Sequence, residues 1–137
     1  MLFRSIAPHE KVEMALRGVL ASMASDPAFS ERVLLIAQAS ISEQIPEATK
    51  AVLKAERGKP YAVIAKIMAD GQAKGTIQPG EPAELSMLFW STIKGLALHK
   101  VSAGAKFRAP DTAILCRMFL TSTSARATNK GIRNERR

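Results

Sequence analysis

The chain has few of the side chains that build disulfides and metal sites. Its 137 residues include one cysteine, Cys116, and two histidines, His9 and His99. A single cysteine can form neither an intrachain disulfide nor a cysteine-based metal cluster. The histidines lie 90 residues apart, and neither has acidic neighbours at the spacing typical of metal ligands. We therefore expect no metal and no other cofactor.

Long apolar runs are also missing. No segment approaches the roughly 18 uncharged residues that a membrane-spanning helix requires. The first residues, MLFRSIAPHEK, become charged too early to contain the apolar region of a signal peptide. The sequence therefore predicts a cytoplasmic protein that does not contact a membrane.

Acidic residues are scarce toward the C-terminus. Residues 1–93 hold ten basic and ten acidic residues, whereas 94–120 and 121–137 each hold five basic residues and one acidic residue. A neutral body with a basic end does not resemble a nucleic-acid-binding fold, where basic residues form a patch on a folded face. We expect one helical domain over 1–122 and a basic, disordered tail over 123–137. The tail either aids solubility or makes weak contacts with phosphates.

Apolar residues recur at helical spacing along most of the chain, and no segment alternates as a strand does. The pattern predicts an all-α fold of about five helices, packed as one antiparallel bundle. Pro60 lies within the third helix and predicts a kink or short break over 58–60, because proline removes a backbone hydrogen bond. The expected helices span about 8–25, 27–44, 46–74, 82–102 and 110–122.

The helix expected over 82–102 is apolar on two faces. At 100° per residue, Leu85, Phe89, Ile93 and Leu96 lie on one side, whereas Met87, Trp90, Leu98 and Val101 lie nearly opposite. In so small a domain, one face packs on the chain's own core. The other face is expected to meet a second subunit, with a strip of small residues that allows close helix approach: Ser91, Gly95 and Ser102.

No group of residues meets the needs of an active site, so we expect no enzymatic activity. The glycines of GQAKGTIQPG follow a helix and lack the Gly-Lys-Ser/Thr sequence of a phosphate-binding loop. We interpret His99 as a hydrogen-bonded structural histidine and Cys116 as a buried thiol. A catalytic role for either residue is the less favoured alternative. Apolar and aromatic residues on several helices indicate either a packed core or a pocket for a small apolar or amphipathic molecule.

Residues 67–100, IMADGQAKGTIQPGEPAELSMLFWSTIKGLALHK, resemble the late part of the C-terminal domain of TetR-family transcriptional regulators. The similar features are a glycine-rich turn from Gly71 to Ile77, the pair Glu81–Pro82 that starts the next helix, and a small-x-x-x-Gly-Leu pattern over 91–96. The preceding residues, 20–55, resemble the family's earlier helices, with Pro46–Glu47 opening a long helix. The resemblance covers roughly residues 8–122.

The resemblance implies an effector-binding domain that forms a homodimer through its last two helices. The resemblance identifies 82–102 and 110–122 as the helices that pair in the dimer. It identifies no pocket residues, so we choose the ligand contacts below only from the apolar faces of the helices. No segment resembles the family's helix-turn-helix, so DNA is expected to be contacted only through such a missing module or weakly through the tail. The expected ligand-binding residues are Met23, Phe29, Tyr61, Ile64, Met68, Phe89 and Ile93. The expected dimer interface is Met87, Trp90, Ser91, Lys94, Gly95, Leu98, Val101, Ile114, Leu115 and Met118.

The main alternative is a stand-alone helical interaction protein whose basic tail contacts nucleic acid or an acidic partner. It predicts binding to duplex DNA that weakens steeply between 50 and 200 mM salt and is lost when residues 123–137 are deleted. Fluorescence anisotropy of a labelled duplex measures both effects.

Overall fold

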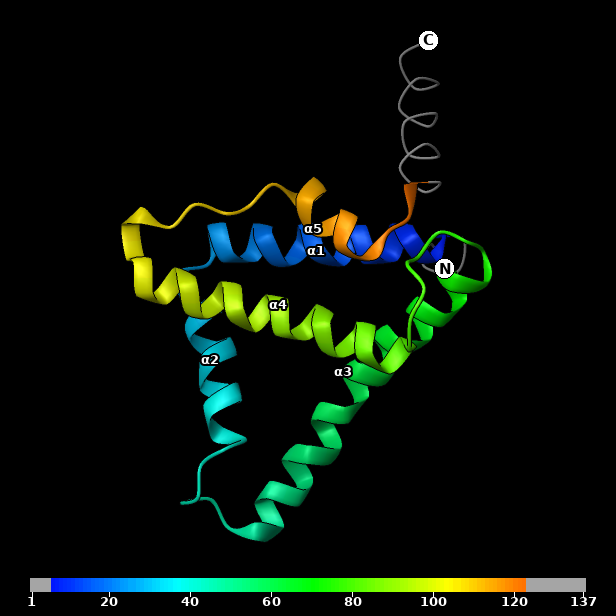
Figure 1. The fold of residues 1–137 in the computed structure, drawn as a ribbon. Helices are drawn as coiled ribbons and strands as arrows, with labels where there is room; N and C mark the ends of the chain where they lie inside the picture. Colours follow the sequence, from blue (N-terminus) through cyan, green and yellow to red (C-terminus); the bar gives the residue numbers. More distant parts are fainter. Residues whose placement is uncertain (1–5, 123–137) are drawn as a thin grey trace.

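The computed structural model describes residues 6–122, which contain five α-helices, one short 3₁₀ helix and no strand (Figure 1). One isolated antiparallel bridge joins Ile77 to Leu120. The all-α prediction is confirmed. Within this range, no helix combines the length and apolar character needed to cross a membrane. The helices are α1 (Pro8–Ser25), α2 (Phe29–Ala39), α3 (Glu47–Ala73), α4 (Pro82–Ala103), η2 (Gly104–Lys106) and α5 (Thr112–Phe119).

Two helices are shorter than the sequence predicts. The helix α2 ends five residues early, because the Ser40 hydroxyl donates to the Ala37 carbonyl at 2.6 Å and the Ile41 amide donates to the Gln38 carbonyl at 3.1 Å. These short-range bonds tighten the last turn and stop the α-helical ladder. The helix α5 starts late, where the Asp111 carboxylate caps the Ala113 amide, and ends at Phe119, after which Leu120 is extended. The predicted tail, 123–137, lies outside the described residues.

The helix α3 passes through Pro60 without the break that the sequence predicts. Two side chains of α4 bond to α3 at this point. The Ser86 hydroxyl donates to the Tyr61 carbonyl at 2.7 Å, and the Trp90 indole donates to the Pro60 carbonyl at 3.3 Å. These bonds hold α3 against α4 where proline weakens its backbone ladder.

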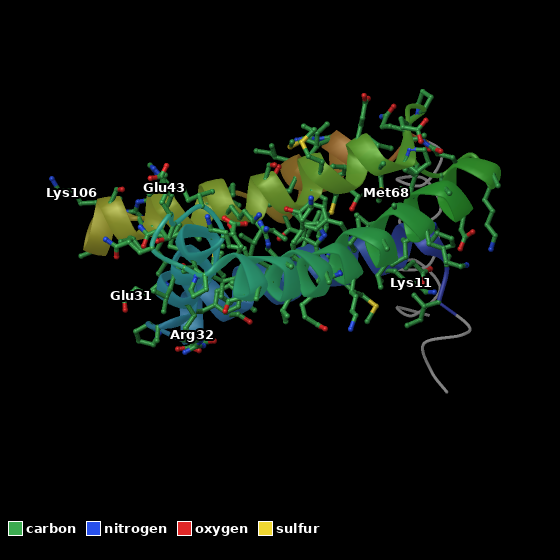
Figure 2. The ribbon with its side chains drawn as sticks, turned by 90° about the horizontal axis from the view of Figure 1, so that it is seen from below. Lys11, Glu31, Arg32, Glu43, Met68 and Lys106 are labelled. Carbon is green, nitrogen blue, oxygen red and sulfur yellow. The ribbon has the colours of Figure 1, made fainter. Side chains whose placement is uncertain are left out.

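The core lies between α1, α4, α5 and the second half of α3, which supply most of its buried residues. One face of α1 is buried there as its spacing predicts. Figure 2 places Met68 between α3 and α4, whereas Glu31 and Lys106 lie at the edge of the molecule. The buried apolar residues are Val12, Leu16, Leu20, Met23, Ile64, Met68, Ile77, Leu85, Phe89, Ile93, Ala97, Leu115, Cys116, Phe119 and Leu120.

The other end of the molecule is thinly packed. The helices α2 and α3 leave opposite ends of α4 and converge at the loop between them, so that the three helices outline a triangle (Figure 1). In α2 only Ser30 is buried, and α3 has no buried residue before Ile64. Large apolar side chains near the apex of the triangle are exposed, among them Leu35, Ile41 and Val52.

The turn from α3 to α4 forms as the glycine pattern predicts. Gly75 has a φ of +72°, and the Thr76 amide donates to the Gly71 carbonyl at 2.9 Å, which closes the helix end. Ile77 folds back onto Gly71, where an added Cβ would lie 2.4 Å from the Ile77 Cδ1 atom. Pro82 then occupies the first position of α4, where its missing N–H has no cost.

We expect the Gly71→Ala variant to be less stable than a matched Gly58→Ala variant of the same helix. At Gly71 the new methyl group overlaps the buried Ile77 side chain, and such overpacking costs about 1–3 kcal/mol. At Gly58 no atom lies within 4 Å, so alanine should instead stabilise the helix by about 0.5–1 kcal/mol. Urea unfolding followed by circular dichroism measures both free energies. Equal changes in the two variants would show that the Ile77 contact is not tightly packed.

Candidate functional site

The residues predicted to bind an effector belong to the core rather than to an open pocket. Five of them are buried: Met23, Ile64, Met68, Phe89 and Ile93. Phe29 and Tyr61 are half-buried. The two cavities described within residues 6–122 are lined by other side chains. A ligand could reach the buried residues only if the helices moved apart, and their role in binding stays a prediction.

Tyr61 instead joins a cluster on the α3–α4 contact. The Lys94 ammonium donates to the Tyr61 hydroxyl at 2.8 Å and lies 5.4 Å from the centre of the Tyr61 ring. The Tyr61 and Trp90 ring centroids are 5.9 Å apart, at an interplanar angle of 41°. Trp90 also meets Phe89 edge to face, with centroids 5.2 Å apart. The structure therefore brings together an expected ligand contact and two expected interface residues.

A second cation, Arg57, precedes Tyr61 on α3, and the sequence analysis did not select it. It lies one helical turn before Tyr61, so the two side chains share a face of α3. Its Nε atom is buried and has no hydrogen-bond partner. Within residues 6–122, neither Arg57 nor Lys94 forms an ion pair with a carboxylate. The sequence could have indicated Arg57, because it is a cation on the same helix face as Tyr61, Ile64 and Met68.

The predicted dimer residues divide into three groups. Leu115 is only 5 % exposed and packs in the core, so it offers little surface to a partner. Trp90 and Lys94 are half-buried against α3 through the hydrogen bonds described above. The others are exposed: Met87, Ser91, Gly95, Leu98 and Val101 on α4, and Ile114 and Met118 on α5.

The exposed group is mostly apolar and lies on two helices that contact each other. The ring centroids of Phe89 in α4 and Phe119 in α5 are 5.9 Å apart. Leu88, 48 % exposed, extends the exposed side of α4. At Gly95 no atom lies within 4 Å of an added Cβ, so this part of α4 is uncovered. We call the exposed residues of α4 and α5, Leu88 included, the pairing surface.

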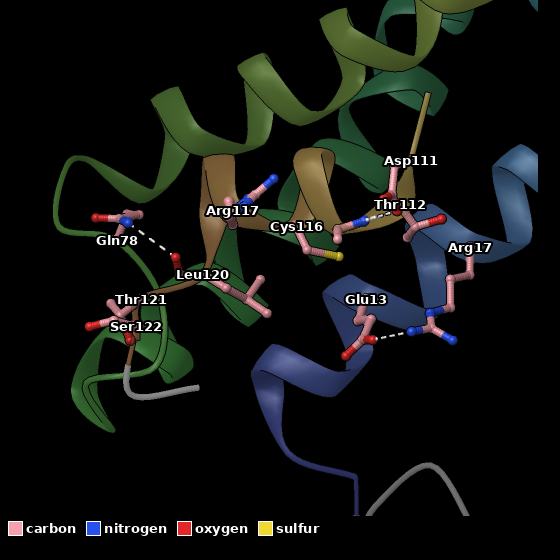
Figure 3. Close-up of a pocket in the computed structure, with 11 residues that line it drawn as sticks. Glu13, Arg17, Gln78, Asp111, Thr112, Cys116, Arg117, Leu120, Thr121 and Ser122 are labelled. Carbon is pink, nitrogen blue, oxygen red and sulfur yellow. Dashed lines mark hydrogen bonds and ion pairs between the residues drawn. The ribbon is translucent and has the colours of Figure 1, made fainter. Parts of the chain in front are cut away.

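The larger cavity, of about 820 Å³, opens between α1 and α5 (Figure 3). Glu13 and Arg17 line it from α1 and form an ion pair at 2.6 Å. Asp111, Cys116 and Arg117 line it from the α5 side. Its lining therefore carries charges of both signs that largely balance.

Cys116 is poorly suited to act as a nucleophile in this cavity. Its burial, with a smaller effect from the Glu13 carboxylate, raises the pKa of the thiol above its ordinary value. The Arg17 guanidinium acts in the opposite direction, but more weakly. Because the thiolate is the reactive form, a raised pKa leaves Cys116 less reactive than a free thiol.

The histidines take separate places. His99 is exposed and its ring meets that of Phe107, with centroids 5.8 Å apart. His9 is buried at the start of α1, and its Nδ1 atom has no hydrogen-bond partner. No group of three or more potential metal ligands occurs within residues 6–122.

A second, smaller cavity of about 290 Å³ lies between the start of α2 and the end of α4. Its lining includes Ser30, Glu31 and Lys100. The Ser30 hydroxyl is buried without a hydrogen-bond partner. The opposite charges of Glu31 and Lys100 favour no particular ligand.

A scan against protein-family models and searches of curated proteins and of solved structures find no match to this chain.

We expect Cys116 to react slowly with iodoacetamide in the folded protein, at a pH just below the ordinary thiol pKa. In urea the same thiol should react faster, because unfolding removes the burial that raises its pKa. A raised folded-state pKa stabilises the fold below the unfolded thiol pKa, about 8.5, and this contribution is lost as the pH rises through the folded value. Mass spectrometry of the alkylated chain measures the rates. Equal folded and unfolded rates would contradict the assignment of a buried thiol.

Proposed function

We propose that residues 8–122 form the ligand-binding and dimerisation domain of a TetR-type transcriptional regulator. The proposal joins the sequence resemblance to the order of the helices. The chain has a long helix, then the Gly71–Ile77 turn, and then a helix that begins at Pro82. This is the order of elements in the family that the sequence resembles. Two helices, α4 and α5, would pair with those of a second copy.

The pairing surface is the observation that carries this proposal. A stable interface buries about 800 Å² on each partner, with an apolar centre. The pairing surface offers six large apolar side chains that are about half exposed: Met87, Leu88, Leu98, Val101, Ile114 and Met118. Ser91 and Gly95 lie among those of α4 and would let two helix backbones approach closely. A second copy of the chain would cover them through a self-complementary contact.

The thin packing of α2 and the first half of α3 supports the ligand-binding part of the proposal. Segments with few buried contacts have low local stability and rearrange at small cost. A small molecule held between α2, α3 and α4 would cover exposed side chains such as Leu35 and Val52. It would favour the arrangement of helices that binds it best. Because α4 belongs both to this region and to the pairing surface, ligand binding would be coupled to dimer geometry.

We expect the chain to be a dimer at tens of micromolar, and Gly95→Gln to weaken that dimer. The new side chain would separate the paired helices, whereas inside one subunit its Cβ meets no atom within 4 Å. The dissociation constant should rise about tenfold or more, a loss of about 1.4 kcal/mol. Sedimentation equilibrium measures the constant.

Gly18→Gln is the matched control, because Gly18 is an exposed glycine of α1 that also has nothing within 4 Å. It should leave the dimer unchanged. A monomeric wild-type chain, or equal effects of the two variants, would contradict the paired-helix proposal. A dimer that binds DNA only through residues 123–137 would favour the alternative function.

A further inference from the structure

Two cations without a carboxylate partner, Lys94 of α4 and Arg57 of α3, occur where α3 meets α4: Lys94 bonds to Tyr61, and Arg57 lies one helical turn before it. Lys94 uses one of its three donors on the Tyr61 hydroxyl. Arg57 makes no hydrogen bond or ion pair within residues 6–122, although its Nε atom is buried. A buried donor without a partner costs about 1–3 kcal/mol, and more when the group is charged. The site therefore has a deficit of negative charge and of acceptors.

The residues nearby do not supply that charge. Glu56, next to Arg57 in sequence, bonds to Lys59 at 2.9 Å, and Glu47 bonds to Lys50 at 3.5 Å. Other lysines of α3 do have partners, since Lys66 pairs with Asp70 at 3.2 Å. Lys94 differs from these surface cations because it lies against the Tyr61 ring instead of a carboxylate. Arg57 also lacks a carboxylate partner within residues 6–122, and it lies one helical turn before Tyr61 on the same face of α3.

We propose that this cluster, Arg57, Tyr61, Trp90 and Lys94, binds the acid group and ring of an aromatic carboxylate. This inference rests on the proposed function, because it names the chemical class of the effector. The carboxylate would accept hydrogen bonds from the Lys94 ammonium and the Arg57 guanidinium. The ring would lie against the faces of Trp90 and Tyr61, whose centroids are 5.9 Å apart.

A ligand with one negative charge fits these surroundings better than a ligand with two. The half-buried Trp90 of the cluster and the buried Phe89, which its ring contacts, lower the local dielectric. Removing a dianion from water into such a setting costs more than removing a carboxylate. An apolar effector without an acid group would leave both cations unpaired.

The test uses the full chain and a matched pair of ligands, 3-phenylpropanoate and 3-phenylpropanamide, which have the same shape but differ in charge. Trp90 is the only tryptophan of the chain, so its emission reports binding at the cluster. We expect the carboxylate to bind about tenfold or more tightly than the amide. In Lys94→Met and in Arg57→Met the two ligands should bind within about threefold of each other.

Lys66→Met is the charge-matched control, because Lys66 is an exposed lysine of the same helix that pairs with Asp70. It should keep the full preference for the carboxylate, and all variants are compared at equal helicity by circular dichroism. If Lys94→Met does not fold, Lys94→Gln replaces it and should lose the preference equally.

Three results would overturn the inference. Equal binding of the acid and the amide would refute the anionic class while leaving a ligand-binding domain in place. A preference that survives in Lys94→Met and Arg57→Met would place the acid group elsewhere, through the general attraction of a chain with net charge +8. Failure of both ligands to change Trp90 emission would count against both the inference and the ligand-binding half of the proposed function.

Discussion

The contact of Ile77 with Gly71 is the constraint on which the rest of the structure depends. The Ile77 side chain takes the space that a Cβ at position 71 would need, so the chain reverses tightly after α3. The residues on either side of Ile77 then bond to the end of α5. The Gln78 amide donates to the Phe119 carbonyl at 2.8 Å, and the Thr121 amide donates to the Thr76 carbonyl at 3.0 Å. One turn thus orients α3 and α4 and also holds α5 over α1.

This arrangement concentrates the packing at one end of the molecule. Most buried residues belong to α1, α4, α5 and the second half of α3, whereas α2 and the first half of α3 together bury only Ser30. Local stability follows buried contacts, so this second part is the one that can rearrange at little cost. The cluster of Arg57, Tyr61, Trp90 and Lys94 lies at the boundary between the two parts. An anion bound there would contact both α3 and α4.

Much of the fold could be predicted because its signals are local. The bounds of α1 match the prediction, and so do the all-α class and the glycine-rich turn. The sequence says less where tertiary contacts act. It predicted a kink or a short break at 58–60, but α3 has no break there, and Ser86 and Trp90 of α4 bond to the Tyr61 and Pro60 carbonyls at this point. The residues expected to bind a ligand were chosen as apolar side chains on helix faces, and that criterion selects core residues equally well.

The sequence by itself determined where helices begin and how α3 turns into α4, since caps, prolines and positive φ angles depend on a few adjacent residues. Only the tertiary structure decided what each face does. Met68 is fully buried and Met118 is half exposed, although both are methionines on apolar helix stripes. Likewise Lys66 pairs with Asp70, whereas Lys94 bonds to a tyrosine 33 positions away. Burial and charge pairing depend on which helices cross, and that information is spread over the whole chain.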